Sequence, residues 1–371
     1  MTAAGAAEQQ PIYWAGYALT GSAADGSDIA PHATALIQKR GVEALNGALI
    51  AALHARPPAN LQVIEDQLAR LDGSTSATVL AAALDRELVS VENLGGKYKL
   101  LAEVAVQALF FDFREKQVIA AYPVTLQYID SFDAPPTAAQ IDAAFERMLY
   151  GDGAAGLSQV FAQTLANARL PSAAARRLQV AGVEFSDAAR AELPDAQLPA
   201  QWSAMLAGEF TKILSAETGI GLLPAASGQA IGGAMAARFA DGSVYQLKIP
   251  DADYRLKLHI DRFATRPLDQ TAVAKVLLFG VVYDVSIAEP LSGKVFFDQP
   301  LRKAATKTMP ASQSDVDVKA AWYETTLAGL AAFSSAAAGR VDGDWLEGQQ
   351  PGGRQLRTQL SSLQELIKSC R

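Results

Sequence analysis

The sequence predicts an α+β protein of two tandem domains, each an antiparallel sheet with helices packed on one face. Its 371 residues suffice for about two or three domains of ordinary size. Apolar and polar side chains alternate along residues 98–110 and 118–128, which is typical of strands with one buried face. Strand-like and helix-like segments also follow one another in the same order in both halves of the chain.

Composition and charge exclude several classes of protein. The chain is 50% apolar and 19% charged, with a net charge of −7, which is too apolar for a disordered chain. An acidic balance without clusters of Lys or Arg is not typical of nucleic-acid binding. The single cysteine, Cys370, excludes an intramolecular disulfide and a cysteine-based zinc site. We therefore expect no metal, no cofactor and no nucleic-acid partner.

No segment predicts a membrane span or a leader. A spanning helix needs roughly 18 uncharged apolar residues. The most apolar run, residues 272–287, contains Lys275 and Asp284 and fits a buried strand better. The first ten residues lack the basic and apolar parts of a signal peptide. Two locations stay open on this ground: the cytoplasm, or the periplasm for an exported protein in its mature form, without a leader.

The first α+β domain is predicted to span residues 1–150. It begins with a strand at 12–19, which a helix follows, and residues 61–84 fit one or two short helices. Residues 86–92 supply a strand beside the alternating hairpin, whose polar face carries Glu103 and Gln107. Thr137-x-x-Gln140 is typical of a capping box that starts the closing helix.

The rest of the chain is predicted to repeat this plan. Residues 151–175 form a connecting helix and linker, and residues 176–340 form the second α+β domain. Within it, Asp241-Gly242 lies between two strand-like runs and indicates a hairpin. Residues 341–371 form a C-terminal helical tail.

Short sequence matches favour an internal duplication. Trp14-Ala-Gly-Tyr17 parallels Val180-Ala-Gly-Val183, and Tyr98-Lys-Leu-Leu101 parallels Tyr254-Arg-Leu-Lys257. The order of elements agrees better than the residues do. The alternative is that two unrelated α+β halves share this order.

Catalytic motifs are absent, so we predict that the protein is not an enzyme. The three histidines share no local segment and fit structural or exposed positions: His32, His54 and His259. Two carboxylate pairs are conceivable acid–base groups, but both fall in turns: Asp112 with Glu115, and Asp342 with Asp344. A hydrolase would need dispersed carboxylates that converge in a cleft.

Aromatic residues give the candidate binding site. If Phe110 enters the helix-covered core, then Leu109, Phe111 and Phe113 lie on the opposite face of the strand. That face then needs a cover, which we expect to be the other domain, with a partner or a lipid as alternatives. Trp14 and Tyr17 differ by an odd step and are expected on opposite faces of their strand. The predicted ligand- or partner-binding residues are Trp14, Tyr17, Leu109, Phe111 and Phe113.

One region resembles a known group of envelope proteins. The segment Ala252-Asp-Tyr-Arg-Leu-Lys-Leu-His-Ile-Asp-Arg-Phe263 precedes an apolar strand at 276–287, the turn Ser292-Gly-Lys-Val295 and an Ala-rich helix at 318–338. This half resembles the ABC-type transport auxiliary lipoproteins. It also resembles the periplasmic domain of the curli secretion channel and the N-terminal domain of the Tol system's propeller protein. The first half looks like a more diverged copy, with Lys97-Tyr-Lys-Leu100 and Glu115-Lys-Gln-Val118 in the corresponding places.

The resemblance implies a non-catalytic periplasmic module that docks to envelope machinery or helps to move lipids. We therefore expect an envelope protein that binds a partner of an export or lipid-transport system. The alternative is a carrier of lipid or another apolar ligand, with a cavity between helices and curved sheets. A hydrolase with dispersed carboxylates is the second alternative.

Overall fold

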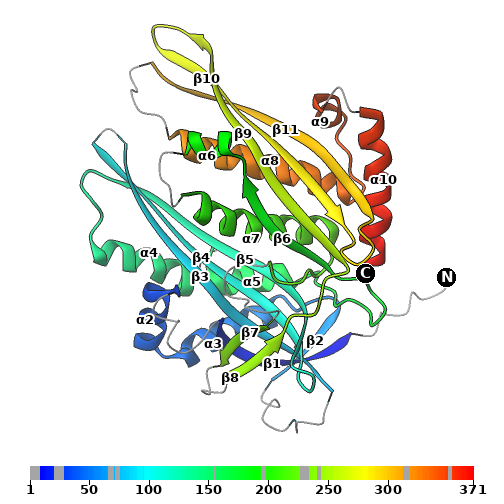
Figure 1. The fold of residues 1–371 in the computed structure, drawn as a ribbon. Coiled ribbons are helices and arrows are strands. Elements are labelled where there is room, and N and C mark those ends of the chain that lie inside the picture. The colour runs from blue at the N-terminus through cyan, green and yellow to red at the C-terminus, as the bar shows by residue number, and fades with distance from the viewer. Residues whose placement is uncertain are drawn as a thin grey trace, which may run out of the picture. The chain divides into compact units, whose positions relative to one another are not determined.

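The computed structural model describes residues 9–20, 29–65, 71, 76–94, 96–151, 153, 155–193, 198–225, 234–239, 244–311, 317–349 and 353–371. Contacts divide the chain into two compact units. Unit 1 comprises Met1–Pro171 and Gly228–Asp251, and unit 2 comprises Ser172–Ser227 and Ala252–Arg371. Each unit combines helices with a sheet, so the α+β class is confirmed (Figure 1).

Unit 1 contains one mixed sheet, called sheet A, and four helices among the described residues. The strands of sheet A are β1 (Gln10–Thr20), β2 (Leu61–Ile64), β3 (Thr78–Leu94), β4 (Lys97–Asp112), β5 (Gln117–Phe132), β7 (Ala234–Phe239) and β8 (Val244–Lys248). Its helices are α2 (Pro31–Arg40), α3 (Val42–Ala55), α4 (Ala138–Tyr150) and α5 (Leu157–Leu165). The predicted capping box is present, because Thr137 and Gln140 hydrogen-bond reciprocally at the start of α4.

The order of sheet A is β2-β1-β3-β4-β5-β8-β7, and β7 also pairs with β1. The strands β3, β4 and β5 form the expected antiparallel meander. In contrast, β1 runs parallel to β3, because α2 and α3 carry the chain back to the same end of the sheet. The additional β1–β7 pairing closes the row of strands into a ring.

The hairpin β7–β8 confirms the predicted strands around residues 241–242, whose own turn lies outside the described residues. Its sequence falls within the predicted second domain, but its strands complete sheet A of unit 1. Helix α5, predicted as part of a linker, also belongs to unit 1. Both segments carry apolar side chains, such as Phe161 and Phe239, that are buried there.

The core of unit 1 lies between α2–α5 and one face of sheet A. It contains Phe110 but none of Leu109, Phe111 and Phe113, as the alternation predicts. Residues 61–84 were expected to be helical, and this prediction is wrong where they are described. They contribute β2 and the first part of β3, whose Val79–Leu84 are all buried. Small Ala side chains there fit a strand that is covered on both faces.

Unit 2 contains sheet B, with strand order β11-β10-β9-β6. Its strands are β6 (Leu178–Phe185), β9 (Tyr254–Gln270), β10 (Ala274–Ala288) and β11 (Val295–Pro310), and its helices are α6 (Asp187–Glu192), α7 (Leu198–Thr218), α8 (Val318–Ala337), α9 (Gly343–Gly348) and α10 (Gly353–Ser369). Helices α7 and α8 cover one face of the sheet (Figure 1). Gly329 allows the close approach of α8, because a Cβ atom there would lie 2.7 Å from the hydroxyl of the buried Tyr283.

The two units repeat one plan: a strand, helices, a three-stranded meander and a further helix. The first strand of each pairs parallel with the meander and is irregular at the same place, between Trp14 and Gly16 in β1 and between Val180 and Gly182 in β6. The sequence similarity between Trp14–Tyr17 and Val180–Val183 relates these same two segments. The match of Tyr98 with Tyr254 is wrong, because Tyr254 begins the first strand of its meander and Tyr98 lies in the second.

Candidate functional site

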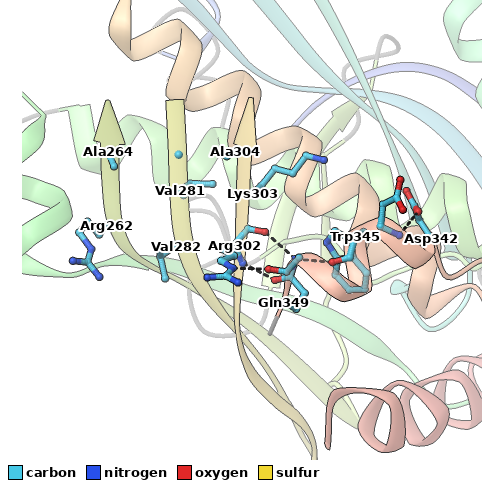
Figure 2. A pocket seen from close by; sticks show the side chains of 13 residues that line it. Arg262, Ala264, Val281, Val282, Arg302, Lys303, Ala304, Asp342, Trp345 and Gln349 are labelled. Atoms are coloured by element: carbon cyan, nitrogen blue, oxygen red, sulfur yellow. Dashed lines mark hydrogen bonds between the residues drawn. The ribbon is translucent and has the colours of Figure 1, made fainter. Parts of the chain in front are cut away.

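A groove of about 440 Å³ lies on sheet B of unit 2, beside α9 (Figure 2). Its floor consists of two rows of neighbouring residues across β9, β10 and β11: Arg262–Val282–Arg302 and Ala264–Gly280–Ala304. The buried Phe263 and Leu301 alternate with these residues and belong to the helix-covered face. The groove therefore lies on the face of sheet B away from α7 and α8.

The residue types explain why a hollow forms at this place. Ala264, Gly280 and Ala304 have the smallest side chains and lie side by side in the register, so little fills the space above them. Arg262 and Arg302 stand in the adjoining row, on either side of Val282. The groove thus combines an apolar floor with guanidinium groups, and its volume is in the usual range for ligand sites.

Helix α9 is held against the edge of β11 by side-chain hydrogen bonds (Figure 2). The amide of Gln349 accepts from Arg302 N at 2.8 Å and donates to Arg302 O at 3.0 Å. The Arg302 guanidinium donates through Nε to Gly348 O at 2.5 Å. Asp342 caps α9 by accepting from Asp344 N at 2.9 Å. These contacts fix one wall of the groove.

The charges that line the groove are mixed. Arg262 and Arg302 supply positive charge, while Asp342 and Asp344 lie at the start of α9. The side chain of Arg262 is 65% exposed, and its nearest acid in the described part, Asp261, is 3.8 Å away. The arrangement fits an apolar segment that carries an acidic group. Sequence reasoning missed this site, because its residues meet only through the register of three strands.

The predicted residues Leu109, Phe111 and Phe113 are brought together in unit 1. Phe111 is fully buried, with its ring 5.8 Å from that of Phe239 in β7 and 6.3 Å from that of Tyr245 in β8. The ring of Phe113 lies 6.2 Å from that of Tyr245. The hairpin, whose sequence was assigned to the second domain but which belongs to unit 1, therefore covers part of this face.

The ammonium of Lys116 lies over the same aromatic group. Its Nζ is 3.6 Å from the centroid of Phe113 and 4.0 Å from that of Tyr245. Burial lowers the pKa of Lys116, which the nearby Asp112 partly offsets. The cluster joins the β4–β5 turn to the hairpin by cation–π and aromatic contacts.

Trp14 and Tyr17 do not lie on opposite faces, so this expectation is wrong. The irregularity between Trp14 and Gly16 inserts one residue, which returns Tyr17 to the face of Trp14. Both side chains pack against the helix-covered core, and the ring of Trp14 lies 6.0 Å from that of Phe161. Burial, reinforced by Tyr150, raises the pKa of Tyr17. Neither residue joins the Phe111 cluster.

A buried polar cluster on sheet A was not predicted. Glu103 has no exposed surface; it accepts from Arg86 Nη1 at 2.6 Å and from Gln127 Nε2 at 2.7 Å. Asp85 accepts from the Thr20 hydroxyl at 3.2 Å. Burial raises the pKa of Asp85, while Arg86, Gln107 and Thr20 act in the opposite direction. Both carboxylates are thus held by neighbouring side chains within the sheet.

The pKa of Asp85 predicts a pH dependence of stability. Because the folded protein binds this proton more tightly than the unfolded chain, the free energy of unfolding falls as pH rises through the interval between the two pKa values. We expect Asp85→Asn to be more stable than the wild type at pH 7 and to lose this advantage in acid. The new amide can also donate to Gln107 Oε1, a buried atom that has no hydrogen-bond partner in the described part of the chain. Urea unfolding at several pH values measures this, with exposed Asp269→Asn as the control for net charge; equal gains at all pH values would contradict it.

The other predicted polar residues have local tasks. Asp112 accepts from Glu115 N at 2.7 Å within the β4–β5 turn. His32 lies 2.9 Å from Asp142, and His259 is opposite Asp284 in the register of sheet B. Within the described ranges, no group of three or more His, Cys, Asp or Glu side chains could hold a metal ion. Helices in the same ranges are all too short or too polar to cross a bilayer.

Comparison with known proteins gives structural similarities only. No family model matches the chain, and no curated protein matches it. One similar solved structure is a minor lipoprotein from Acinetobacter baumannii, with 20% identity, a TM-score of 0.25, and coverage of 44% of this chain and 98% of its own. Another is a DUF330 protein from Xanthomonas campestris, with 15% identity, a TM-score of 0.22, and coverage of 48% of this chain and 92% of its own. Similarity at these scores carries no conclusion about fold or activity.

Proposed function

We propose that this chain is a non-enzymatic protein of the bacterial periplasm that binds a partner of an export or lipid-transport system. Binding takes place in the groove on the face of sheet B away from α7 and α8. The groove itself carries this proposal: a hollow of about 440 Å³ with an apolar floor and the guanidinium groups of Arg262 and Arg302. Such a surface recognises a partner by shape and charge and needs no reacting group.

The cellular location in the proposal comes from the sequence. The resemblance of residues 252–263 and of the following strand and helix to envelope auxiliary proteins supports a periplasmic role. Asp112 and Asp342 accept backbone hydrogen bonds in a turn and a helix cap, and His32 lies within hydrogen-bond distance of Asp142, which supports recognition over catalysis.

A carrier of a lipid or another apolar ligand is the second candidate, because the groove floor is apolar. The groove differs from the predicted cavity in its place, since it lies on the sheet face away from α7 and α8. Organic extraction of the purified protein, followed by lipid analysis, separates the candidates. If the wild type contains stoichiometric lipid and a variant with a filled groove does not, the carrier is favoured. If the purified wild type contains no lipid, partner binding is favoured.

Filling the groove is expected to abolish binding without unfolding the protein. A Cβ atom at Gly280 would meet Ala264 Cβ and Lys303 O at 3.9 Å, which are ordinary contacts. Gly280→Val should therefore leave stability unchanged or raise it by up to about 1 kcal/mol. We expect this variant to lose the partners that the wild type captures from envelope extract, measured by quantitative mass spectrometry.

The matched control is Ser286→Val, on the same strand and the same face but outside the groove. It should capture the same proteins as the wild type. Equal capture by all three chains would contradict a role for the groove.

A further inference from the structure

Strand β11 is one edge of sheet B. Side chains hydrogen-bond to the outward backbone groups of its first part, whereas the described residues leave those of its second part uncovered. An edge strand presents alternate N–H and C=O groups that no neighbouring strand pairs. β11 pairs with β10 without a register shift from Phe297 to Pro310. The same alternation therefore applies over this whole stretch.

The chain covers the first part of this edge with its own side chains. The amide of Gln349 bonds to both N and O of Arg302, as a residue of an added strand would. Gln359 Oε1 accepts from Asp298 N at 2.8 Å. Pro300, between them, has no N–H to pair. These contacts also show which way the groups point: the backbone of Arg302 faces away from β10.

The second part of the edge has no such cover among the described residues. Two-residue alternation from Arg302 makes the N–H and C=O groups of Ala304, Thr306 and Thr308 point outward. All three residues are exposed. The opposite edge of the sheet, β6, is covered by the chain itself. Leu223 N donates to Leu178 O at 3.0 Å, and Gln179 Nε2 donates to Pro224 O at 2.8 Å.

We propose that the edge Ala304–Thr308 of β11 takes an extended, acidic peptide segment of a protein partner as an added strand. Ala304 belongs both to the groove and to this edge, so one segment can continue from one to the other. Main-chain hydrogen bonds supply affinity in this mode, and pockets beside the strand supply specificity. Arg262 and Arg302 favour an acidic side chain at the groove end. The inference rests on the proposed function and names the partner's chemistry.

The test uses the full chain and a panel of fluorescein-labelled peptides that alternate Thr or Val with Glu. Thr306→Pro removes an outward N–H and leaves the pairing with β10 intact, which an edge strand tolerates. Thr306→Ala is the matched control. We expect about tenfold weaker peptide binding to Thr306→Pro and unchanged binding to Thr306→Ala, measured by fluorescence anisotropy. Hydrogen exchange should show protection of the Ala304, Thr306 and Thr308 amides by the peptide.

Other results separate the edge from the groove. Suppose that Arg262→Ser weakens peptide binding, whereas Thr306→Pro and N-methylation of the peptide leave it unchanged. This result would support binding in the groove and overturn the added strand. Edge protection that is insensitive to Gly280→Val would keep the added strand and contradict the groove function. A panel without binding, or protection that grows with protein concentration without peptide, would overturn the proposal, the latter in favour of a second copy.

Discussion

Phe111→Ala is expected to lower the free energy of unfolding by about 3–5 kcal/mol, the range for removing a buried aromatic ring. Phe111 is fully buried, and its ring contacts both strands of the hairpin β7–β8. Among the described residues the hairpin pairs with β5 through Gln117 and Lys248 and with β1 through three residue pairs, so side-chain contacts with β4 add to a short backbone pairing. The variant should also raise proteolysis and amide exchange in the hairpin.

Chemical unfolding followed by circular dichroism measures this effect. The control is Ile129→Ala on β5, because Ile129 is 63% exposed and should cost less than about 0.5 kcal/mol. A loss below about 1 kcal/mol for Phe111→Ala, or unchanged exchange in the hairpin, would contradict the role given to this cluster.

Arg86→Met is expected to cost about 3–5 kcal/mol, because it leaves a buried carboxylate without its cation. The side chain of Glu103 is 0% exposed and that of Arg86 is 18% exposed. After the substitution, Gln127 is the one described residue that would still donate to Glu103. Adding Glu103→Leu to this variant should recover most of the stability, because the pair is then replaced by apolar groups.

The control for this pair is Lys97→Met, which breaks an ion pair with Asp133 whose side chains are 64% and 86% exposed. Exposed pairs contribute about 0–1 kcal/mol. If Arg86→Met and Lys97→Met lower the free energy of unfolding by similar amounts in urea, burial does not make the Arg86–Glu103 pair more important for stability than an exposed pair.

Local periodicity was sufficient to predict β4, β5 and the second part of β3. Alternation along β4 assigned Phe110 to the helix-covered core and Phe111 to the opposite face, as the structure shows. It also separated Glu103 and Gln107 from the core, as polar residues of the opposite face, but it assigned them no partners. Glu103 is buried because Arg86 and Gln127 of neighbouring strands satisfy its charge, and pairing between strands is not visible in a local pattern.

Other features of the fold and the site cannot be recognised from a local sequence pattern. The single inserted residue before Gly16 reverses the face of Tyr17 relative to simple alternation. The Ala-rich start of β3 has no polar face, so its period gave no strand signal. The groove arises where Ala264, Gly280 and Ala304 of three strands meet, although each of these residues is ordinary in its own sequence context.

Site-specific photo-crosslinking in cells tests the central claim most directly, because it reports what lies in the groove. A crosslinking amino acid at Val282, in the groove floor, is compared with one at Ser286, on the same face of β10 beyond the groove. We expect a defined protein adduct from position 282, its loss in the Gly280→Val background, and none from position 286. The same adducts from both positions, or none from position 282, would contradict recognition by the groove.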